Sequence, residues 1–220
     1  MCGRFTLTLP PDLVAEAFGL DDVPALEARY NIAPTQPVAV VRRLRAGGPR
    51  QLDLLRWGVS APPAPGARGR GPVINARSES VATRSAFRDA FRRRRCLVPA
   101  DGFYEWSAAG ARRQAFHVAR RDGRPLAFAG VWEPERPGGT PASCVILTSE
   151  PNDLLRPIHD RMPVILDPAD YDRWLTPEGP PDALAGLLKP YPAAPLAARP
   201  VGPTVNNAQN EGAACLDPAS

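Results

Sequence analysis

Gln114-Ala115-Phe116-His117-Val118-Ala119-Arg120 and Leu126-Ala127-Phe128-Ala129-Gly130-Val131-Trp132-Glu133, with the five residues between them, form the stretch of sequence that decides the fold. Both runs have strand character. Asp122-Gly123 between them is a dipeptide that β-hairpin turns favour, because glycine reaches positive φ angles at no steric cost. The sequence therefore predicts a β-hairpin in which 114–120 pairs with 126–133.

Other short runs of strand character occur along the whole chain. Two of them, Pro37–Arg43 and Gln51–Trp57, are predicted to form a second hairpin across Ala46-Gly47-Gly48-Pro49. Because the strands come as hairpins rather than alternating with helices, the sequence predicts an α+β fold of mainly antiparallel, barrel-like sheets with peripheral helices. The remaining strands are expected at 5–9, 73–76, 96–99, 103–107, 143–148 and 164–166, and the helices at 10–18, 83–94, 168–175 (capped by Asp167) and, weakly, 182–188.

Composition is that of one large globular domain of 220 residues, 44% of them hydrophobic. The four cysteines are scattered without Cys-x-x-Cys spacing, so neither a zinc site nor a disulfide framework is predicted, and no metal or cofactor is expected. No apolar run approaches the length of a membrane span, and the N-terminus lacks a signal-peptide core. A cytoplasmic protein without membrane partners is therefore expected.

Positive charge is carried almost entirely by arginine, since Lys189 is the single lysine among 27 basic residues that face 23 acidic ones. Arginine binds phosphates through a planar fork of donors, so dense clusters permit a nucleic-acid surface. A solvated helix face accounts for the charge equally well. The clusters are 42, 43, 45 and 50; 68 and 70; and 84, 88 and 92–95.

The chain begins Met1-Cys2-Gly3-Arg4. Because the side chain at position 2 is small, removal of Met1 by methionine aminopeptidase is expected, and Cys2 would then carry an α-amine beside its thiol. These groups titrate near ~7.7–8.0 and ~8.5, so both are partly nucleophilic at neutral pH. Such an aminothiol can capture an aldehyde as an imine and then close a thiazolidine ring. These four residues taken alone fit an ordinary chain start better.

Four polar residues interrupt or adjoin apolar strands: Asn75, Glu105, Thr148 and His159. A polar group in such a place costs free energy unless it is partnered, which makes each a site candidate. Taken singly, each has a structural explanation; a strand glutamate, for example, points outward more often than inward. Together with Cys2 they suggest imine chemistry, which needs a base for the amine proton and an acid for the leaving hydroxyl.

Six sequence blocks follow one another along the chain: Met1-Cys2-Gly3-Arg4-Phe5, Arg29-Tyr30-Asn31-Ile32-Ala33-Pro34, Leu55-Arg56-Trp57-Gly58, Ile74-Asn75-Ala76-Arg77-Ser78-Glu79, Arg95–Trp106 and His159-Asp160-Arg161-Met162-Pro163. In this order they resemble the signature of the SOS response-associated peptidase (SRAP) family of abasic-site processing proteins. A seventh segment, Pro200-Val201 through Val205-Asn206-Asn207 to Glu211-Gly212, is similar to the C-terminal block of that family. The resemblance runs over nearly the whole chain.

The resemblance implies a DNA-repair protein that binds abasic sites in single-stranded DNA and forms a covalent thiazolidine crosslink through Cys2. It implies that Asn75 positions the N-terminus or the sugar and that Glu105 is the acid/base carboxylate near the amine. His159 would be the proton donor to the sugar oxygen and would assist strand cleavage by β-elimination, a lyase activity. The implied DNA contacts are phosphates held by Arg4, Arg77 and Arg161, with Thr148 as a site hydroxyl.

The resemblance also implies one domain over residues 1–212, and the tail at 213–220 is expected to be disordered. The protein is expected to be a cytoplasmic monomer that joins the nucleoid when bound to DNA. The family's hydrolase or peptidase label fits removal of Met1 and release of the crosslink; Ser, His and Asp occur in no recognisable protease arrangement.

The Pro/Gly/Ala/Arg loop from Gly58 to Pro72 departs from the family pattern. Many members carry a tryptophan there that can stack on bases, whereas this loop offers Arg68 and Arg70 and is expected to be mobile. Binding through charge rather than through base wedging is therefore predicted for this loop.

Two other functions fit parts of the sequence. N-terminal-nucleophile amidotransferases also begin Met-Cys-Gly and use Cys2 as a glutaminase nucleophile. Those enzymes use an Asn-Gly pair in the oxyanion hole, and the sequence contains no Asn-Gly dipeptide. The other alternative is a basic module that binds nucleic acid without covalent chemistry.

Overall fold

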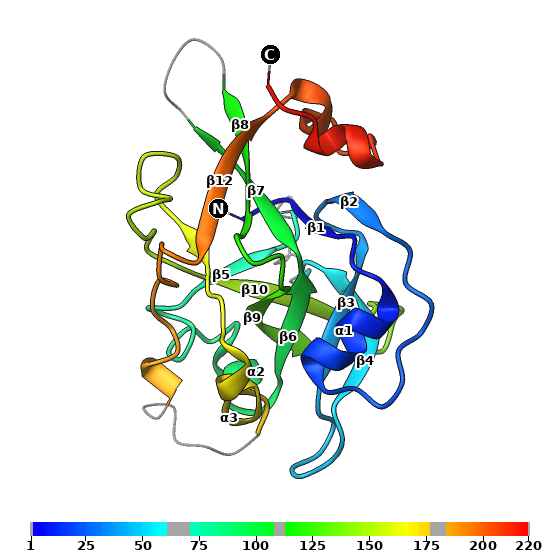
Figure 1. Cartoon of the computed structure of the whole chain (residues 1–220). Helices are drawn as coiled ribbons and strands as arrows, with labels where there is room; N and C mark the ends of the chain where they lie inside the picture. The colour runs from blue at the N-terminus through cyan, green and yellow to red at the C-terminus, as the bar shows by residue number, and fades with distance from the viewer. Residues whose placement is uncertain (1, 61–70, 108–112, 177–183, 220) are drawn as a thin grey trace.

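Two mainly antiparallel sheets form the body of the protein, and a few short helices lie at its periphery (Figure 1). The computed structural model describes residues 2–60, 71–107, 113–176 and 184–219. The predicted α+β fold with mainly antiparallel sheets is thus confirmed. The first sheet has the order β12 (Leu196–Val201), β8 (Gln114–Arg120), β7 (Gly102–Ser107), β1 (Phe5–Leu7) and β2 (Arg29–Ile32).

The second sheet curves into a partial barrel. Its strand β10 (Ser143–Ser149) pairs in parallel with β4 and antiparallel with β9, so the sheet bends back toward its own start. The short strand β5 (Asn75–Arg77) also pairs in parallel with β10. The other strands are β11 (Met162–Pro163), β4 (Gln51–Trp57), β3 (Pro37–Arg42), β6 (Arg95–Ala100) and β9 (Leu126–Glu133), in the order β11-β10-β4-β3-β6-β9.

The predicted hairpin between 114–120 and 126–133 is wrong, although both strands exist. β8 pairs with β7 and β12 in the first sheet, whereas β9 pairs with β6 and β10 in the second. The residues between them do form a turn, in which Arg120 makes an ion pair with Asp122 and Gly123 has a φ of 71°. The turn carries the chain from one sheet to the other, because each strand pairs along its length with strands elsewhere in the sequence.

The second predicted hairpin is confirmed, since β3 and β4 pair in register from Pro37 with Arg56 to Arg42 with Gln51. The helix α1 (Pro11–Phe18) also forms and ends at Gly19 in the left-handed conformation. The predicted helix at 83–94 is shorter than expected, because only Arg88–Arg93 (α2) is α-helical and turns precede it.

Two predictions in the C-terminal half of the chain need correction. The strand expected at 164–166 lies earlier, at β11, and Ile165 makes only an isolated bridge to Phe128. The helix expected at 168–175 is a 3-10 turn (Pro168–Asp170) followed by α3 (Tyr171–Leu175). Asp167 does not cap it and accepts a hydrogen bond from the Tyr191 hydroxyl. The helix expected at 182–188 begins outside the described residues.

Residues 213–219 are part of the fold rather than the disordered tail that the sequence predicts. A 3-10 turn at Pro203–Asn206 is followed by another at Ala213–Leu216, whose Cys215 is fully buried. Pro218 bridges to Val201, and the amide of Gly202 donates to the carbonyl of Asp217. These contacts cover the end of the first sheet, which explains why the segment is ordered.

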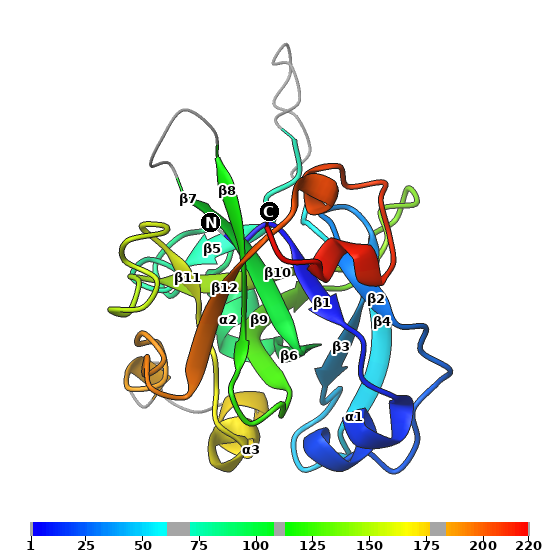
Figure 2. The same cartoon turned by 45° about the horizontal axis from the view of Figure 1, so that its top comes forward.

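Packing of Phe5 fixes the start of the chain. The centroid of its ring lies 5.2 Å from that of Trp57 and 5.8 Å from that of Phe128, both edge to face. Only 1% of Phe5 is exposed. Burial of such a side chain is worth about 2 kcal/mol. The N-terminal end of β1 is thereby held beside β5 and β7 (Figures 1 and 2). No helix among the described residues is long and apolar enough to cross a membrane.

Candidate active site

Cys2 is fully buried at the point where β1, β5 and β7 meet. The side-chain amide of Asn75 donates to the carbonyl of Cys2 at 2.8 Å. Asn75 is itself fixed, because β5 pairs with β10 and the indole of Trp57 donates to the carbonyl of the preceding Ile74. The sequence therefore brings Asn75 to the backbone of Cys2, the place that a positioning role requires.

Glu105 points into the interior rather than outward. β7 lies between β1 and β8, with Phe103 opposite Phe5 and the amide of Tyr104 donating to the carbonyl of Arg4. Only 1% of Glu105 is exposed. Burial raises the pKa of its carboxyl to about 7. At neutral pH this carboxyl can therefore both take and give a proton.

The thiol of Cys2 is neutral in this environment. Burial raises its pKa well above the ordinary range, and the nearby charge of Glu105 raises it further. The thiol therefore needs a base to become a nucleophile, and the carboxylate of Glu105 is the charged group that lies near it.

His159 completes the cluster from a turn that Asn152 organises. The side chain of Asn152 accepts from the amide of Leu155, and the carbonyl of Leu155 accepts from the amide of His159. The imidazole Nε2 lies 3.9 Å from Glu105 Oε2. The four residues predicted for the chemistry, Cys2, Asn75, Glu105 and His159, are thus brought together.

Two contacts compete for the other nitrogen of His159. Nδ1 accepts from the backbone amide of Arg161 at 3.0 Å and also lies 2.9 Å from Asp160 Oδ1. Burial lowers the pKa of the imidazole, so the neutral ring that accepts from Arg161 is favoured at neutral pH. Asp160 is 86% exposed and contributes little. In this tautomer Nε2 carries the proton and presents it to the site.

The cluster opens into a groove of 1180 Å³. Positively and negatively charged side chains both line the groove, so the arginines can hold an anionic ligand while a proton is exchanged nearby. Its walls include the four arginines 77, 113, 156 and 161, the acidic residues Glu105, Glu150 and Asp160, and Trp106 and His159.

Arg161, Arg77 and Thr148 meet at the rim of this groove. Thr148 is buried on β10 opposite Arg77 of β5, and its carbonyl accepts from Arg161. The guanidinium of Arg161 also forms a two-pronged ion pair with Glu79, at 2.6 and 3.0 Å. The three predicted DNA contacts of this region are therefore neighbours, but a phosphate at Arg161 would have to share it with Glu79.

Arg4 lies apart from them, on the other side of Trp106. It lines a second hollow of 1030 Å³ with Trp106 and Arg113. Its Nη1 donates to Asn31 Oδ1 at 2.7 Å and to the carbonyl of Val205 at 2.8 Å. Burial lowers the pKa of its guanidinium, and both of these acceptors are uncharged.

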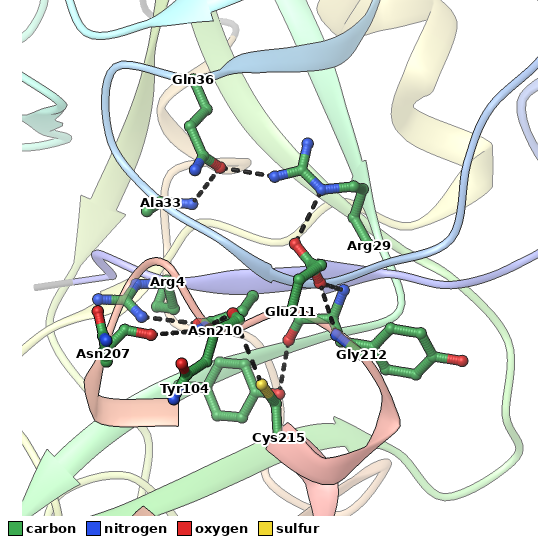
Figure 3. A network of polar contacts seen from close by, with 12 residues as sticks. Arg4, Arg29, Ala33, Gln36, Tyr104, Asn207, Asn210, Glu211, Gly212 and Cys215 are labelled. Carbon is green, nitrogen blue, oxygen red and sulfur yellow. Dashed lines mark hydrogen bonds and ion pairs between the residues drawn. The ribbon is translucent and has the colours of Figure 1, made fainter. Parts of the chain in front are cut away.

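Three of the sequence blocks converge on Arg4 (Figure 3). The buried amide of Asn31 donates to the carbonyls of Asn207 and Asn210, at 3.0 and 2.8 Å. Glu211 accepts from the backbone amide of Tyr30 and pairs with Arg29. The second block and the C-terminal block therefore act as a scaffold that holds the side chain two residues after Cys2.

Trp106 is the residue that the sequence analysis missed. It is half-buried, separates the two hollows and donates to Asn206 Oδ1 at 2.7 Å. The sequence feature that could have identified Trp106 is its position directly after Glu105, near the end of a predicted strand. The loop with Arg68 and Arg70 lies outside the described residues over 61–70. Among the described residues no group of three His, Cys, Asp or Glu side chains could hold a metal ion.

The chain is similar to known proteins over most of its length. A family model described as SOS response associated peptidase (SRAP) matches residues 1–208. The abasic site processing protein YoqW of Bacillus subtilis is 37% identical, over 96% of each chain. The abasic site processing protein YedK of Escherichia coli is 31% identical, over 99% of this chain and 100% of its own. A crystal structure from Bacteroides thetaiotaomicron, 20% identical, shares the fold with a TM-score of 0.83 over the full length of both chains.

Proposed function

Because the chain belongs to the SOS response associated peptidase family, we propose that it processes abasic sites in DNA by forming a thiazolidine with the sugar aldehyde through Cys2. One observation carries the proposal: Cys2, held by Asn75, lies beside a buried carboxyl whose pKa is about 7 and near an imidazole. Relatives named as abasic site processing proteins support the choice of lesion.

The reaction begins once Met1 is removed and the amine of Cys2 is exposed. The amine attacks C1′ of the ring-opened sugar, and a carbinolamine forms. His159 or protonated Glu105 delivers a proton to its hydroxyl, which leaves as water and gives the imine. Because the thiol is neutral, the amine reacts first.

The thiol closes the ring in the second stage. Sγ bonds to the imine carbon, its proton passes to the carboxylate of Glu105, and the imine nitrogen takes up a proton. The product is a five-membered ring that contains both the nitrogen and the sulfur of Cys2. If the imine instead loses a proton from C2′, β-elimination breaks the C3′–O bond and the 3′-phosphate leaves, which cleaves the strand; His159 would assist that proton transfer.

Single-stranded substrate, a monomeric state and cytoplasmic action at the nucleoid belong to the same proposal. The groove is an open one lined by arginines, which suits a strand that enters sideways with its phosphates exposed. The peptidase activity is proposed to be removal of Met1, which uncovers the amine, and release of the crosslink.

The test is incubation with a single-stranded oligonucleotide that carries one abasic site, followed by a denaturing gel. A band shifted by the mass of the protein is expected. The matched control carries a tetrahydrofuran analogue, which has no aldehyde and should give no band. Equal bands from both oligonucleotides, or none from either, would contradict the proposal.

Trp106 is expected to supply the base stacking that the 58–72 loop lacks. Stacking on an aromatic ring is worth roughly 1–3 kcal/mol per base and depends little on salt. Trp106→Ala should therefore weaken single-strand binding by about 5- to 150-fold while leaving the salt dependence unchanged. The measurement is a salt titration in a Cys2→Ala background. A change in slope without a change of affinity at high salt would exclude stacking.

A further inference from the structure

A run of helical turns leads from the groove to α2. The amide of Val81 donates to the carbonyl of Arg77, that of Arg84 to Ser80, and that of Arg88 to Arg84, each at 2.8–2.9 Å. Arg77 lines the groove at one end of this run. The run continues through α2, which lies below β5 in the view of Figure 1. The run therefore connects the groove to α2 along the chain.

Arg84, Arg88 and Arg92, which we call the α2 arginine stripe, are exposed along this run. The side chains that face the core are Val81, Phe87, Ala90 and Phe91, each at most 6% exposed. Residues spaced by four are neighbours on a helix and rise about 6 Å per step. Arg88 and Arg92 are neighbours of this kind on α2, and Arg84 lies one turn before the helix, where its carbonyl accepts from the amide of Arg88.

Acids neutralise the stripe little: Asp89, whose pKa is lowered chiefly by its hydrogen bond to Arg94, feels the charge of Arg92 without pairing with it. Several other arginines do have acidic partners: Arg93 and Arg94 pair with Asp89, and Arg120 pairs with Asp122. Within the part of the chain that the structure describes, none of the three stripe arginines has an ion pair within 4.0 Å. Like charges at this spacing destabilise a helix by a few tenths of a kcal/mol per pair. An ordinary solvated face would gain stability from interleaved acids.

We propose that the α2 arginine stripe extends the DNA-binding surface, holding backbone phosphates of the strand several nucleotides from the abasic site. This rests on the proposed function. The occupant is a nucleic-acid strand because the run of turns that carries the stripe starts at Arg77, which lines the groove, and the phosphates of a polyanion complement exposed guanidinium groups. A strand leaving the groove on this side would meet the stripe next.

The test compares two triple variants in a Cys2→Ala background, where equilibrium binding can be measured. One replaces the stripe by Arg84→Gln, Arg88→Gln and Arg92→Gln, which preserves helix propensity. The other replaces three exposed loop arginines away from α2, by Arg45→Gln, Arg121→Gln and Arg124→Gln. Both lose the same charge, so any difference reports position. Circular dichroism checks that both are folded.

Single-stranded oligonucleotides from about 5 to about 25 nucleotides, each carrying one abasic analogue, are titrated at several salt concentrations. For long oligonucleotides the stripe variant should lose on the order of tenfold in affinity at low salt, and its salt slope should fall by about 2, since each single-strand phosphate contact contributes about 0.7. The shortest oligonucleotide, which does not reach the stripe, should bind as it does to the parent. The loop variant should behave as the parent at all lengths.

Three outcomes would overturn the inference: equal losses in both variants, equal losses at all lengths, or no loss at any length. Extending the strand on one side only of the abasic site sharpens the result, because one stripe serves one flank; equal losses on both flanks would also contradict it. Crosslinking of the shortest abasic oligonucleotide by the Cys2-containing protein is followed in parallel. That reaction tests the proposed function independently, so the two can fail separately.

Discussion

Cys2→Ser protein will form no heat-stable adduct with abasic DNA, yet borohydride will still trap it on the strand. Serine keeps the α-amine, so the imine forms, but it lacks the sulfur that closes the thiazolidine ring. The position is fully buried beside Glu105, so the small change from sulfur to oxygen leaves the packing almost intact. The measurement is a denaturing gel after heating, with and without borohydride. We expect loss of essentially all stable adduct.

The matched control uses another buried thiol. Cys144 is fully buried, and burial raises its pKa, but it lies inside β10 and has no α-amine. Cys144→Ser should crosslink like the natural protein. A second control keeps Cys2 but blocks its α-amine, through a bulky residue inserted between Met1 and Cys2 that prevents removal of Met1, and should lose the stable adduct. A stable adduct from Cys2→Ser would show that sulfur is not in the linkage.

Local sequence patterns predicted where strands and turns lie better than they predicted which strands pair with each other. Asp122-Gly123 marks a real turn, and β8 and β9 are real strands, but the turn joins two sheets. Six residues of β9 are buried in succession, so both of its faces are covered, and its two edges pair with β6 and β10. β3 and β4 are the contrasting case, where the sequence neighbour is also the spatial one. Pairing is decided by burial that the local sequence does not reveal.

At the site, too, the residues could be identified from the sequence but their arrangement could not. The candidate residues Cys2, Asn75, Glu105 and His159 were all found in the sequence, because polar groups among apolar ones are visible there. Whether Glu105 faces inward could not be read from alternation, since β7 is covered on both faces by the chain packed around it. The anchoring of Arg4 by Asn31 and the carbonyl of Val205 joins residues up to 201 positions apart. Such contacts require the tertiary fold.

The pH dependence of crosslinking follows from the burial of Glu105. With a pKa of about 7, its carboxylate fraction rises through neutral pH, so the rate of ring closure should rise with an inflection near pH 7. Glu105→Gln keeps the shape of the side chain but removes the carboxylate that acts as the base. It should slow crosslinking by about 10²- to 10⁴-fold and abolish that inflection. Rates are measured by quenched gels between about pH 5 and 9, with DNA saturating.

Glu150→Gln is the matched control, because Glu150 is an exposed carboxylate in the same groove. It changes the groove charge equally without touching the buried cluster, and its rate profile should keep the inflection. An inflection that persists in Glu105→Gln would assign it to another group, such as His159 or the amine, and would remove Glu105 from the role of base.

Stability gives a second readout of the same carboxyl, with a sign fixed by linkage. The folded-state pKa is raised from 4.5 to about 7, so the folded protein holds a proton that the unfolded chain releases. The free energy of unfolding therefore falls as pH rises from about 4.5 to about 7 and stays lower above. Glu105→Gln should be more stable than the natural protein at about pH 8, by up to ~3 kcal/mol, since each pKa unit corresponds to 1.36 kcal/mol. Near pH 4 the two should unfold alike. Equal denaturation midpoints at both pH values would mean that the carboxyl is not held in the neutral form, and Glu150→Gln should show no such pH-dependent gain.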